Sequence, residues 1–304
     1  MVQRWSGRET RALRNALRLT VRAFADQIGV SHRMISKWEK AGEQTHPRPA
    51  NQAALDTLFA TAPPEAKERF LASLQERSVP ASTDMILPST DLRRALQHPG
   101  DGRWMAYVDE GVYLSGQQDK PVWLGDYWID LYPVTNQEYA AFIKSTGHRT
   151  PKHWTDGRYA PELAHHPVVF VDWNDAASYA DWAGKKLPSA LQWEKAARGT
   201  AGNTYPWGMQ PTIAKGNFRE SANGTTTPVD GYQSGASPYG VYDLCGNTWE
   251  WTATSTTEGR YQLKGSAFTS PFERCTPSRW NDASSTMLDD DSGFRCATTQ
   301  PPRN

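Results

Sequence analysis

The 304-residue sequence is poor in cysteine, has no excess of either charge and contains no long apolar run. Its three cysteines, an odd number in a chain this long, indicate a reducing compartment rather than a disulfide framework. No apolar stretch approaches the roughly 20 residues that a helix needs to cross a membrane. The first residues, which include Arg4, Arg8 and Glu9, lack the apolar core of a signal peptide. We therefore expect a cytoplasmic protein with no membrane partner.

Near its start the chain has a glycine, Gly29, between two short apolar repeats at helical spacing. A glycine supplies the left-handed backbone that a sharp turn between helices needs, and Ser31 is placed to cap the second helix. The polar residues that follow are spaced to face outward: His32, Arg33, Ser36 and Lys37. This pattern predicts a helix-turn-helix whose second helix presents its polar face to the DNA major groove.

About residues 9–60 resemble a Cro/repressor-type (XRE-like) helix-turn-helix domain of bacterial transcriptional regulators. The matching packing residues are Phe24, Ala25, Ile28, Gly29, Val30, Ile35 and Trp38. The resemblance implies binding to double-stranded DNA, with phosphate contacts near Thr20 and Ser31 and base contacts from His32, Arg33 and Lys37. Residues 1–50 contain ten Lys and Arg against four Asp and Glu, as phosphate binding requires. The alternative is a plain helical bundle whose charged faces are merely solvated.

The length of the chain favours two domains, and its composition changes between them. Helical periodicity continues to about residue 75, whereas residues 76–90 are rich in Ser, Pro and Thr. We therefore place an all-α domain at 1–75, a linker at 76–98 and a second domain at 99–304. Eleven of the thirteen tryptophans fall in the second domain, among short β-like runs and many glycines. It is predicted to be an α+β domain with much irregular structure.

Three helices can be placed in the second domain. Capping boxes that begin at Thr135 and Ser189 each predict a helix start, because the residue three positions later can bond back to the cap. A third helix is predicted at 174–183. Six tryptophans could form a carbohydrate-binding platform or belong to the core: Trp173, Trp182, Trp193, Trp207, Trp249 and Trp251.

Six ordered sequence blocks carry a second resemblance. They lie at 127–142, 166–176, 186–194, 205–208 (Tyr-Pro-Trp-Gly), 246–251 (Gly-Asn-Thr-Trp-Glu-Trp) and 293–296 (Gly-Phe-Arg-Cys). Residues 104–298 thereby resemble formylglycine-generating enzymes and sulfatase-modifying factors. The resemblance implies a compact variant of the C-type-lectin fold with little regular structure. It also places the six tryptophans in the family's packing blocks, so we expect them in the core. It also implies that Cys296 is a buried free thiol, because Ala180 stands where secreted relatives have its partner.

The resemblance does not settle activity, because the superfamily includes copper-dependent cysteine oxidases, iron-dependent sulfoxide synthases and binding modules. The copper-binding branch has two cysteines, five apart, where this chain has Thr269 and Arg274. Cys275 lies one residue beyond, but a hydroxyl cannot replace its partner thiolate on copper. The adjacent His165 and His166 lack the spacing of an iron site. We therefore expect neither copper nor iron and assign no catalytic residue.

Calcium is a separate expectation, because it is structural in the family and prefers the oxygen ligands that loops supply. The resemblance assigns this role to Asp243, Asn247 and Glu250, although these residues could instead bond the loop backbone. A polar, acidic loop at 280–292 lies where lectin-like relatives display ligand contacts, with a solvated surface loop as the alternative. The predicted ligand-binding residues are Ser266, Arg274, Trp280 and Asn281.

These features together predict a DNA-binding transcriptional regulator whose second domain binds a ligand or a protein. A homodimer would match two half-sites on DNA. One alternative is a metal-dependent oxidase or oxygenase with an attached DNA-binding head. The other is a non-catalytic interaction scaffold in a bacterial signalling or conflict system.

Overall fold

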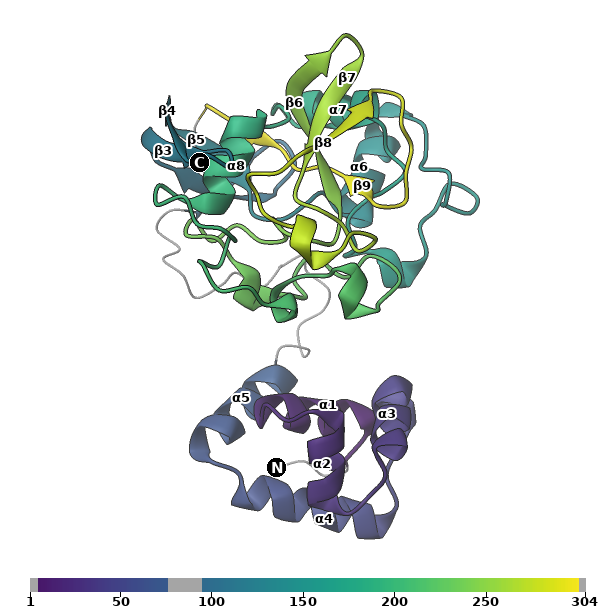
Figure 1. Cartoon of the computed structure of the whole chain (residues 1–304). Coiled ribbons are helices and arrows are strands. Elements are labelled where there is room, and N and C mark those ends of the chain that lie inside the picture. The colour runs from purple at the N-terminus through teal and green to yellow at the C-terminus, as the bar shows by residue number, and fades with distance from the viewer. Residues whose placement is uncertain (1–4, 76–94, 301–304) are drawn as a thin grey trace. The chain divides into compact units, whose positions relative to one another are not determined.

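A computed structural model describes residues 5–75 and 95–300 of the chain (Figure 1). The chain divides into two compact units, Met1–Asp84 and Met85–Asn304. Most of the predicted linker, residues 76–94, lies outside the described residues. Residues 95–97 were also expected in the linker, but Ala95–Gln97 form strand β1, which pairs with β2 of the larger unit. The ordered part of the second domain therefore begins by residue 95 rather than 99.

The smaller unit is a helical bundle, as predicted. Its helices are α1 (Gly7–Ala16), α2 (Val21–Ile28), α3 (His32–Ala41), the short 3₁₀ turn η1 (Gly42–Gln44), α4 (Pro49–Thr61) and α5 (Pro64–Gln75). The first helix begins at a capping box that Ser6 and Glu9 form. Fully buried Phe24, Ile35 and Phe70 bring residues from α2, α3 and α5 into one core. Within the described residues, no helix has both the length and the apolar character to span a membrane.

The larger unit contains small sheets joined by long irregular segments. One sheet has the order β1-β2-β5-β10, from β1, β2 (Trp104–Val108), β5 (Tyr127–Asp130) and β10 (Ala297–Thr298). A two-stranded hairpin consists of β3 (Gly111–Ser115) and β4 (Lys120–Leu124). The third sheet has the order β8-β7-β6-β9, from β8 (Asn281–Ser284), β7 (Arg260–Lys264), β6 (Trp249–Thr257) and β9 (Ser292–Gly293). In Figure 1, β6 and β7 form a long hairpin with β8 beside it.

The helices of this unit are α6 (Asn136–Thr146), α7 (Trp173–Trp182) and α8 (Ala190–Arg198). Their starts follow the predicted signals, since Thr135 and Ser189 both form capping boxes. The described residues of this unit also form the short 3₁₀ turns η3 (Pro161–Leu163), η4 (Ile213–Lys215), η5 (Arg219–Ser221), η6 (Gln233–Gly235) and η7 (Phe272–Arg274). The expectation of an α+β domain with little regular structure is therefore confirmed.

Buried ion pairs join chain segments of the larger unit that no helix or strand connects. Arg295 is fully buried and donates from Nε and Nη2 to both carboxylate oxygens of Glu250, at 2.6 and 2.7 Å. Lys185, also buried, donates to Asp130 at 2.7 Å, and the pKa of Lys185 is raised because the attraction of Asp130 and Asp101 outweighs desolvation. Such pairs are costly to break inside a protein, so they hold the chain segments around the core in register.

Candidate DNA-binding face and ligand pocket

The turn between α2 and α3 has the geometry that the sequence predicted. Gly29 is left-handed, with φ of 72°, and the amide of Val30 returns to the Ala25 carbonyl at 3.0 Å. Thr20 caps α2 by accepting a bond from the Ala23 amide, and Ser31 caps α3 by accepting one from Met34. Both hydroxyls are exposed but already serve the helix ends.

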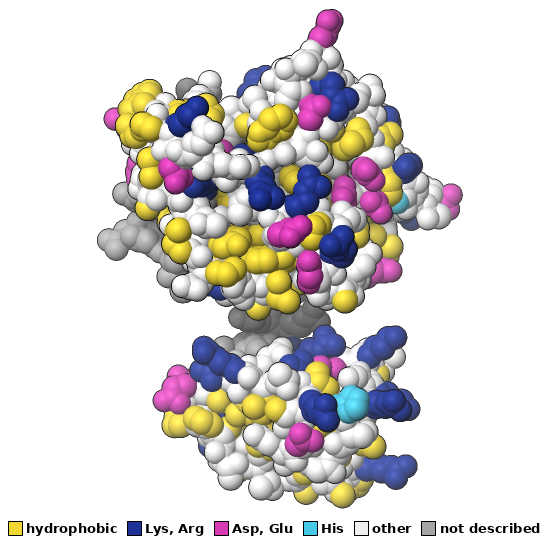
Figure 2. Space-filling view, viewed as in Figure 1, with side chains coloured by type: hydrophobic (Ala, Val, Ile, Leu, Met, Phe, Trp, Pro, Cys, Tyr) yellow, Lys and Arg dark blue, Asp and Glu magenta, His cyan; other side chains and the backbone are white. Residues whose placement is uncertain are grey.

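Helix α3 buries one face and leaves the other open. Ile35 and Trp38 pack in the core of the helical unit, whereas His32, Arg33, Ser36 and Lys37 are all exposed. Figure 2 shows Lys and Arg side chains beside a histidine on the face of this unit that carries α3. Met34, which the sequence analysis did not single out, is 40% exposed between these polar residues. The described face therefore combines positive charge with one apolar side chain.

A buried ion pair fixes how α3 lies against α1. Glu39 is 8% exposed and accepts two bonds from Arg14, at 2.7 and 3.0 Å. Arg11 adds a bond from its guanidinium to the Glu39 carbonyl at 3.1 Å. A bidentate arginine–carboxylate pair restricts orientation as well as distance. The exposed face of α3 is thus held on a rigid support.

The larger unit has a pocket of about 190 Å³. It is lined by Gln117, Trp249, Arg274, Arg279 and Trp280. Trp249 is the first residue of β6, and its indole ring lies 6.0 Å from the Arg274 guanidinium. Two positive side chains and two indole rings therefore meet in one small hollow.

The pocket is assembled from segments far apart in the sequence. The η7 turn ends at Arg274, whose amide bonds to the Pro271 carbonyl at 3.0 Å. Gln117 comes from the β3–β4 turn, which Arg198 holds through the Leu114 and Gly116 carbonyls at 2.9 and 2.8 Å. Sequence proximity could not reveal this meeting, so Gln117 and Arg279 were missed.

The predicted ligand-binding residues are only partly brought together. Arg274 and Trp280 line the pocket, and Trp280 is 50% exposed. Asn281 lies outside the pocket lining, at the start of β8, where its side chain accepts a bond from the Asp282 amide. Ser266 is fully buried with φ of 78°, and its hydroxyl has no hydrogen-bond partner among the described residues. Trp249, predicted as core, is both buried and part of the pocket wall.

The three residues predicted to bind calcium are not arranged as one ligand set. Glu250 is occupied by Arg295, and its Oε2 also accepts a bond from the Trp193 indole at 2.7 Å. Asp243 accepts a bond from the Asn247 side-chain amide at 2.8 Å. Burial raises the pKa of Asp243 to about 7. Asp243 and Asn247 therefore bond to each other, whereas Glu250 neutralises the positive charge of Arg295.

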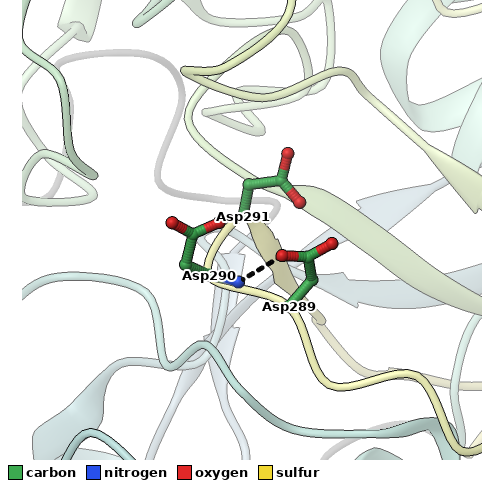
Figure 3. Close-up of side chains that lie close together, drawn as sticks. All are labelled: Asp289, Asp290 and Asp291. Carbon is green, nitrogen blue, oxygen red and sulfur yellow. Dashed lines mark hydrogen bonds between the residues drawn. The ribbon is translucent and has the colours of Figure 1, made fainter.

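The acidic part of the 280–292 loop brings three carboxylates together. Oxygens of Asp289, Asp290 and Asp291 lie within 4.8 Å of one another. Figure 3 shows the three side chains on one short stretch of the loop. Asp291 accepts a bond from the Thr269 hydroxyl, and its carbonyl accepts the Trp249 amide at 2.8 Å. Burial is the main reason that the pKa of Asp291 is raised. The Asp291 carbonyl thus ties the loop to the strand that carries Trp249, and its side chain ties the loop to Thr269.

Comparison with known families matches both parts of the chain. A family model described as the sulfatase-modifying factor enzyme 1-like domain matches residues 94–300, and a helix-turn-helix family model matches residues 7–70. The chain belongs to the sulfatase-modifying factor family. The predicted fusion of a helix-turn-helix domain with a domain of this family is confirmed.

Individual relatives show how far the likeness extends. The formylglycine-generating enzyme of Thermomonospora curvata is 33% identical over 236 residues, which cover 55% of this chain and 77% of that enzyme. Protein YfmG of Bacillus subtilis is 37% identical over 171 residues, 43% of this chain, and the match spans only 34% of YfmG. The structure of PvdO from Pseudomonas aeruginosa has a TM-score of 0.56 at 23% identity, covering 67% of this chain and 97% of PvdO. This last likeness shows a shared fold alone.

The residues at the family's copper positions do not fit the metal. Thr269 offers a hydroxyl that already donates to Asp291, and Arg274 places a permanent positive charge at the second position. Copper in such a site needs thiolates, and a guanidinium would repel the ion. The nearby cysteines do not compensate, since Cys245 and Cys275 are both buried and the Cys245 thiol contacts the Cys275 carbonyl. Burial raises the pKa of Cys245, which favours its neutral form.

Proposed function

We propose that this member of the sulfatase-modifying factor family is a DNA-binding transcriptional regulator whose larger domain binds a ligand instead of oxidising cysteine. The observation that supports the proposal is the presence of two features in one chain. One is a rigidly supported helix α3 with an exposed basic face. The other is a pocket in which Arg274 stands at a position where copper chemistry needs a thiolate.

On DNA, helix α3 would enter the major groove. Arg33 and Lys37 are four residues apart and both exposed, so they lie on one side of the helix. Arginine pairs with guanine through two hydrogen bonds, and lysine can reach either a base or a phosphate. The capped ends of α2 and α3, at Thr20 and Ser31, would place their amides near the phosphates. Two copies of the chain would bind two half-sites.

Ligand binding would regulate transcription if the liganded and free chains differ in DNA affinity. Such coupling is reciprocal, so DNA would change the affinity for the ligand by the same factor. A structural calcium ion at Asp243 and Asn247 is part of the proposal, with Glu250 remaining bound to Arg295.

The DNA-binding role is tested by selecting duplexes from a random pool with the full chain and measuring affinity by fluorescence anisotropy. Arg33→Ala should cost about 1–3 kcal/mol on the selected site and relax its sequence preference. Lys37→Ala should weaken binding on all duplexes and lower the salt dependence if it contacts phosphate. The exposed Arg158, in the larger unit, provides a matched control, because Arg158→Ala removes the same charge from another surface.

The expected results separate a DNA reader from a helical bundle with solvated charges. A selected consensus sequence, together with a loss confined to the α3 variants, supports the proposal. If the pool yields no consensus, and if Arg33→Ala and Arg158→Ala reduce affinity equally, the α3 face is not a recognition surface. The proposed DNA-binding function would then be rejected.

A further inference from the structure

The pocket lined by Arg274 and Arg279 carries positive charge that has no ion-pair partner among the described residues. No hydrogen bond or ion pair joins the Arg274 or Arg279 guanidinium to another described residue. Other arginines of the same unit are paired, as Arg198, Arg260 and Arg295 are with carboxylates. Two unpaired guanidinium groups that line one hollow create a local positive potential, which favours an anion.

Two carboxylates in the segments around Arg274 have other partners. Glu220 accepts a bond from the Phe272 amide at 3.0 Å, and Asp291 accepts one from the Thr269 hydroxyl. Neither belongs to the pocket lining, and no acidic residue is found in that lining among residues 5–75 and 95–300. Their bonds instead hold the two segments that surround Arg274. Neither of these two carboxylates therefore pairs with a guanidinium of the pocket lining.

The two tryptophans define the shape of that ligand. Trp249 presents its ring toward Arg274, and Trp280 leaves 50% of its surface exposed beside the same groups. Indole faces bind flat apolar groups, and an arginine next to a ring positions an anion at the edge of such a group. A ligand that satisfies both features has an anionic head and a planar body.

The size of the pocket limits the planar body. Its volume of about 190 Å³ is below the range of about 300–1,000 Å³ that is typical of drug-sized sites. One ring with one charged substituent is therefore more suitable than a nucleotide. The side-chain amide of Gln117, on the turn held by Arg198, adds a neutral polar group to the wall.

We propose that this pocket binds a small aromatic carboxylate. The carboxylate lies between Arg274 and Arg279, and the ring packs against Trp280 with Trp249 behind it. A planar carboxylate matches the fork of an arginine better than it matches any other cationic side chain. The inference rests on the proposed ligand-binding role of this domain and names the chemical class of the ligand.

The test uses the full chain without DNA and measures the binding of benzoate by ligand-detected NMR and calorimetry. Benzamide has the same ring without the charge, and acetate has the charge without the ring. Benzoate should bind more tightly than both. Arg274→Gln and Arg279→Gln should each weaken benzoate binding by about tenfold or more, since tenfold corresponds to about 1.4 kcal/mol. Trp280→Ala should weaken benzoate while leaving acetate unchanged.

Arg158→Gln is the matched control, because it removes an exposed guanidinium outside the pocket. Arg274, Arg279 and Trp280 are exposed, so their variants should keep the thermal unfolding midpoint of the parent. Equal binding of benzoate and benzamide would overturn the proposal, as would loss of benzoate binding in Arg158→Gln to the same extent. Absence of benzoate binding to the parent protein would overturn it too.

DNA affinity measured on the same samples separates this inference from the proposed function. Benzoate binding in a chain that selects no DNA sequence would support the pocket assignment and reject the regulator. Specific DNA binding without benzoate binding would reject the ligand class alone.

Discussion

Asp243 is a carboxylate that burial pushes toward its neutral form. Its pKa rises to about 7 from a usual value of 3.8, and the bond from Asn247 and the charge of Arg295 offset only part of the desolvation. The folded chain therefore keeps a proton that the unfolded chain releases between about pH 4 and pH 7. Because the folded state binds more protons in that window, its free energy of unfolding falls as the pH rises through it.

We expect this loss of stability in urea unfolding of the larger unit, measured with a chelator at pH 4.5 and 7.5. Each unit of pKa shift corresponds to about 1.4 kcal/mol. Asp243→Asn should flatten the pH dependence, because an amide can still accept the Asn247 bond without titrating. Exposed Asp156→Asn is the control and should retain the parent's slope. At pH 7.5, calcium should stabilise the parent but not Asp243→Asn; an equal pH slope in both proteins would contradict this account.

Some residue-scale features could be predicted from sequence and others could not. Thr269 and Arg274 could be assigned to the family's copper positions from sequence, because these positions are found by counting along the chain from the blocks that resemble the family. The pairing of Glu250 with Arg295 joins residues 45 positions apart, and no local pattern distinguishes this carboxylate from a metal ligand. Gln117 reaches the pocket through a hairpin turn whose position depends on Arg198. Tertiary contacts determine the roles of Glu250 and Gln117, and the local propensities of the residues contain no information about those contacts.

At the scale of elements, the orientation of α3 depends on its close approach to α1. A Cβ atom on Gly7 would lie 1.8 Å from the Trp38 carbonyl oxygen, and backbone cannot move aside as a flexible side chain could. Gly7→Ala should therefore force α1 away from α3 and strain the Arg14–Glu39 pair. We expect a loss of about 1–3 kcal/mol in the stability of the helical unit, as for other overpacked sites. DNA affinity should fall as well.

Thermal unfolding and anisotropy on the selected duplex would measure both effects. Gly125→Ala is a suitable control, because the nearest atom to its added Cβ is a Trp123 side-chain carbon at 3.8 Å. That variant should behave like the parent in both assays. If Gly7→Ala also kept the parent's stability and affinity, the proposed dependence of α3 on α1 would be wrong.

The element starts show why local signals succeed or fail. Thr135 and Ser189 predicted helix starts correctly, since a capping box involves only four neighbouring residues. Strand β1 was missed because it is three residues long and exists through pairing with β2. The start of α1 at Gly7 is not a propensity signal, because glycine is a poor helix former and its place here depends on the close approach to Trp38.

At the scale of the molecule, the change in composition after residue 75 correctly indicated two folded units. The division was predictable because each unit needs its own apolar core and the sequence between them has no helical or strand periodicity. The internal arrangement of the larger unit was less accessible. Its long loops are held by buried pairs such as Lys185–Asp130, whose partners are distant in sequence.

Separate cores predict separate unfolding. The apolar cluster around Phe24 contains only residues of the helical unit, and the cluster around Phe294 contains only residues of the larger unit. Both side chains are fully buried, so truncation to alanine should cost about 3–5 kcal/mol in the unit concerned. Calorimetry of the full chain should show two transitions. Phe24→Ala should lower or abolish one, and Phe294→Ala should lower the other.

Each variant is the control for its partner, because each removes the same phenyl group from a different core. Distant substitutions that share no contacts act independently, so the unaffected transition should keep the midpoint of the parent. A single transition that both variants lower equally would mean that the units unfold together. Two independent transitions would instead mean that the free units do not stabilise each other. Any effect of the ligand on DNA affinity must then arise from a coupling that the bound ligand or the bound DNA itself creates.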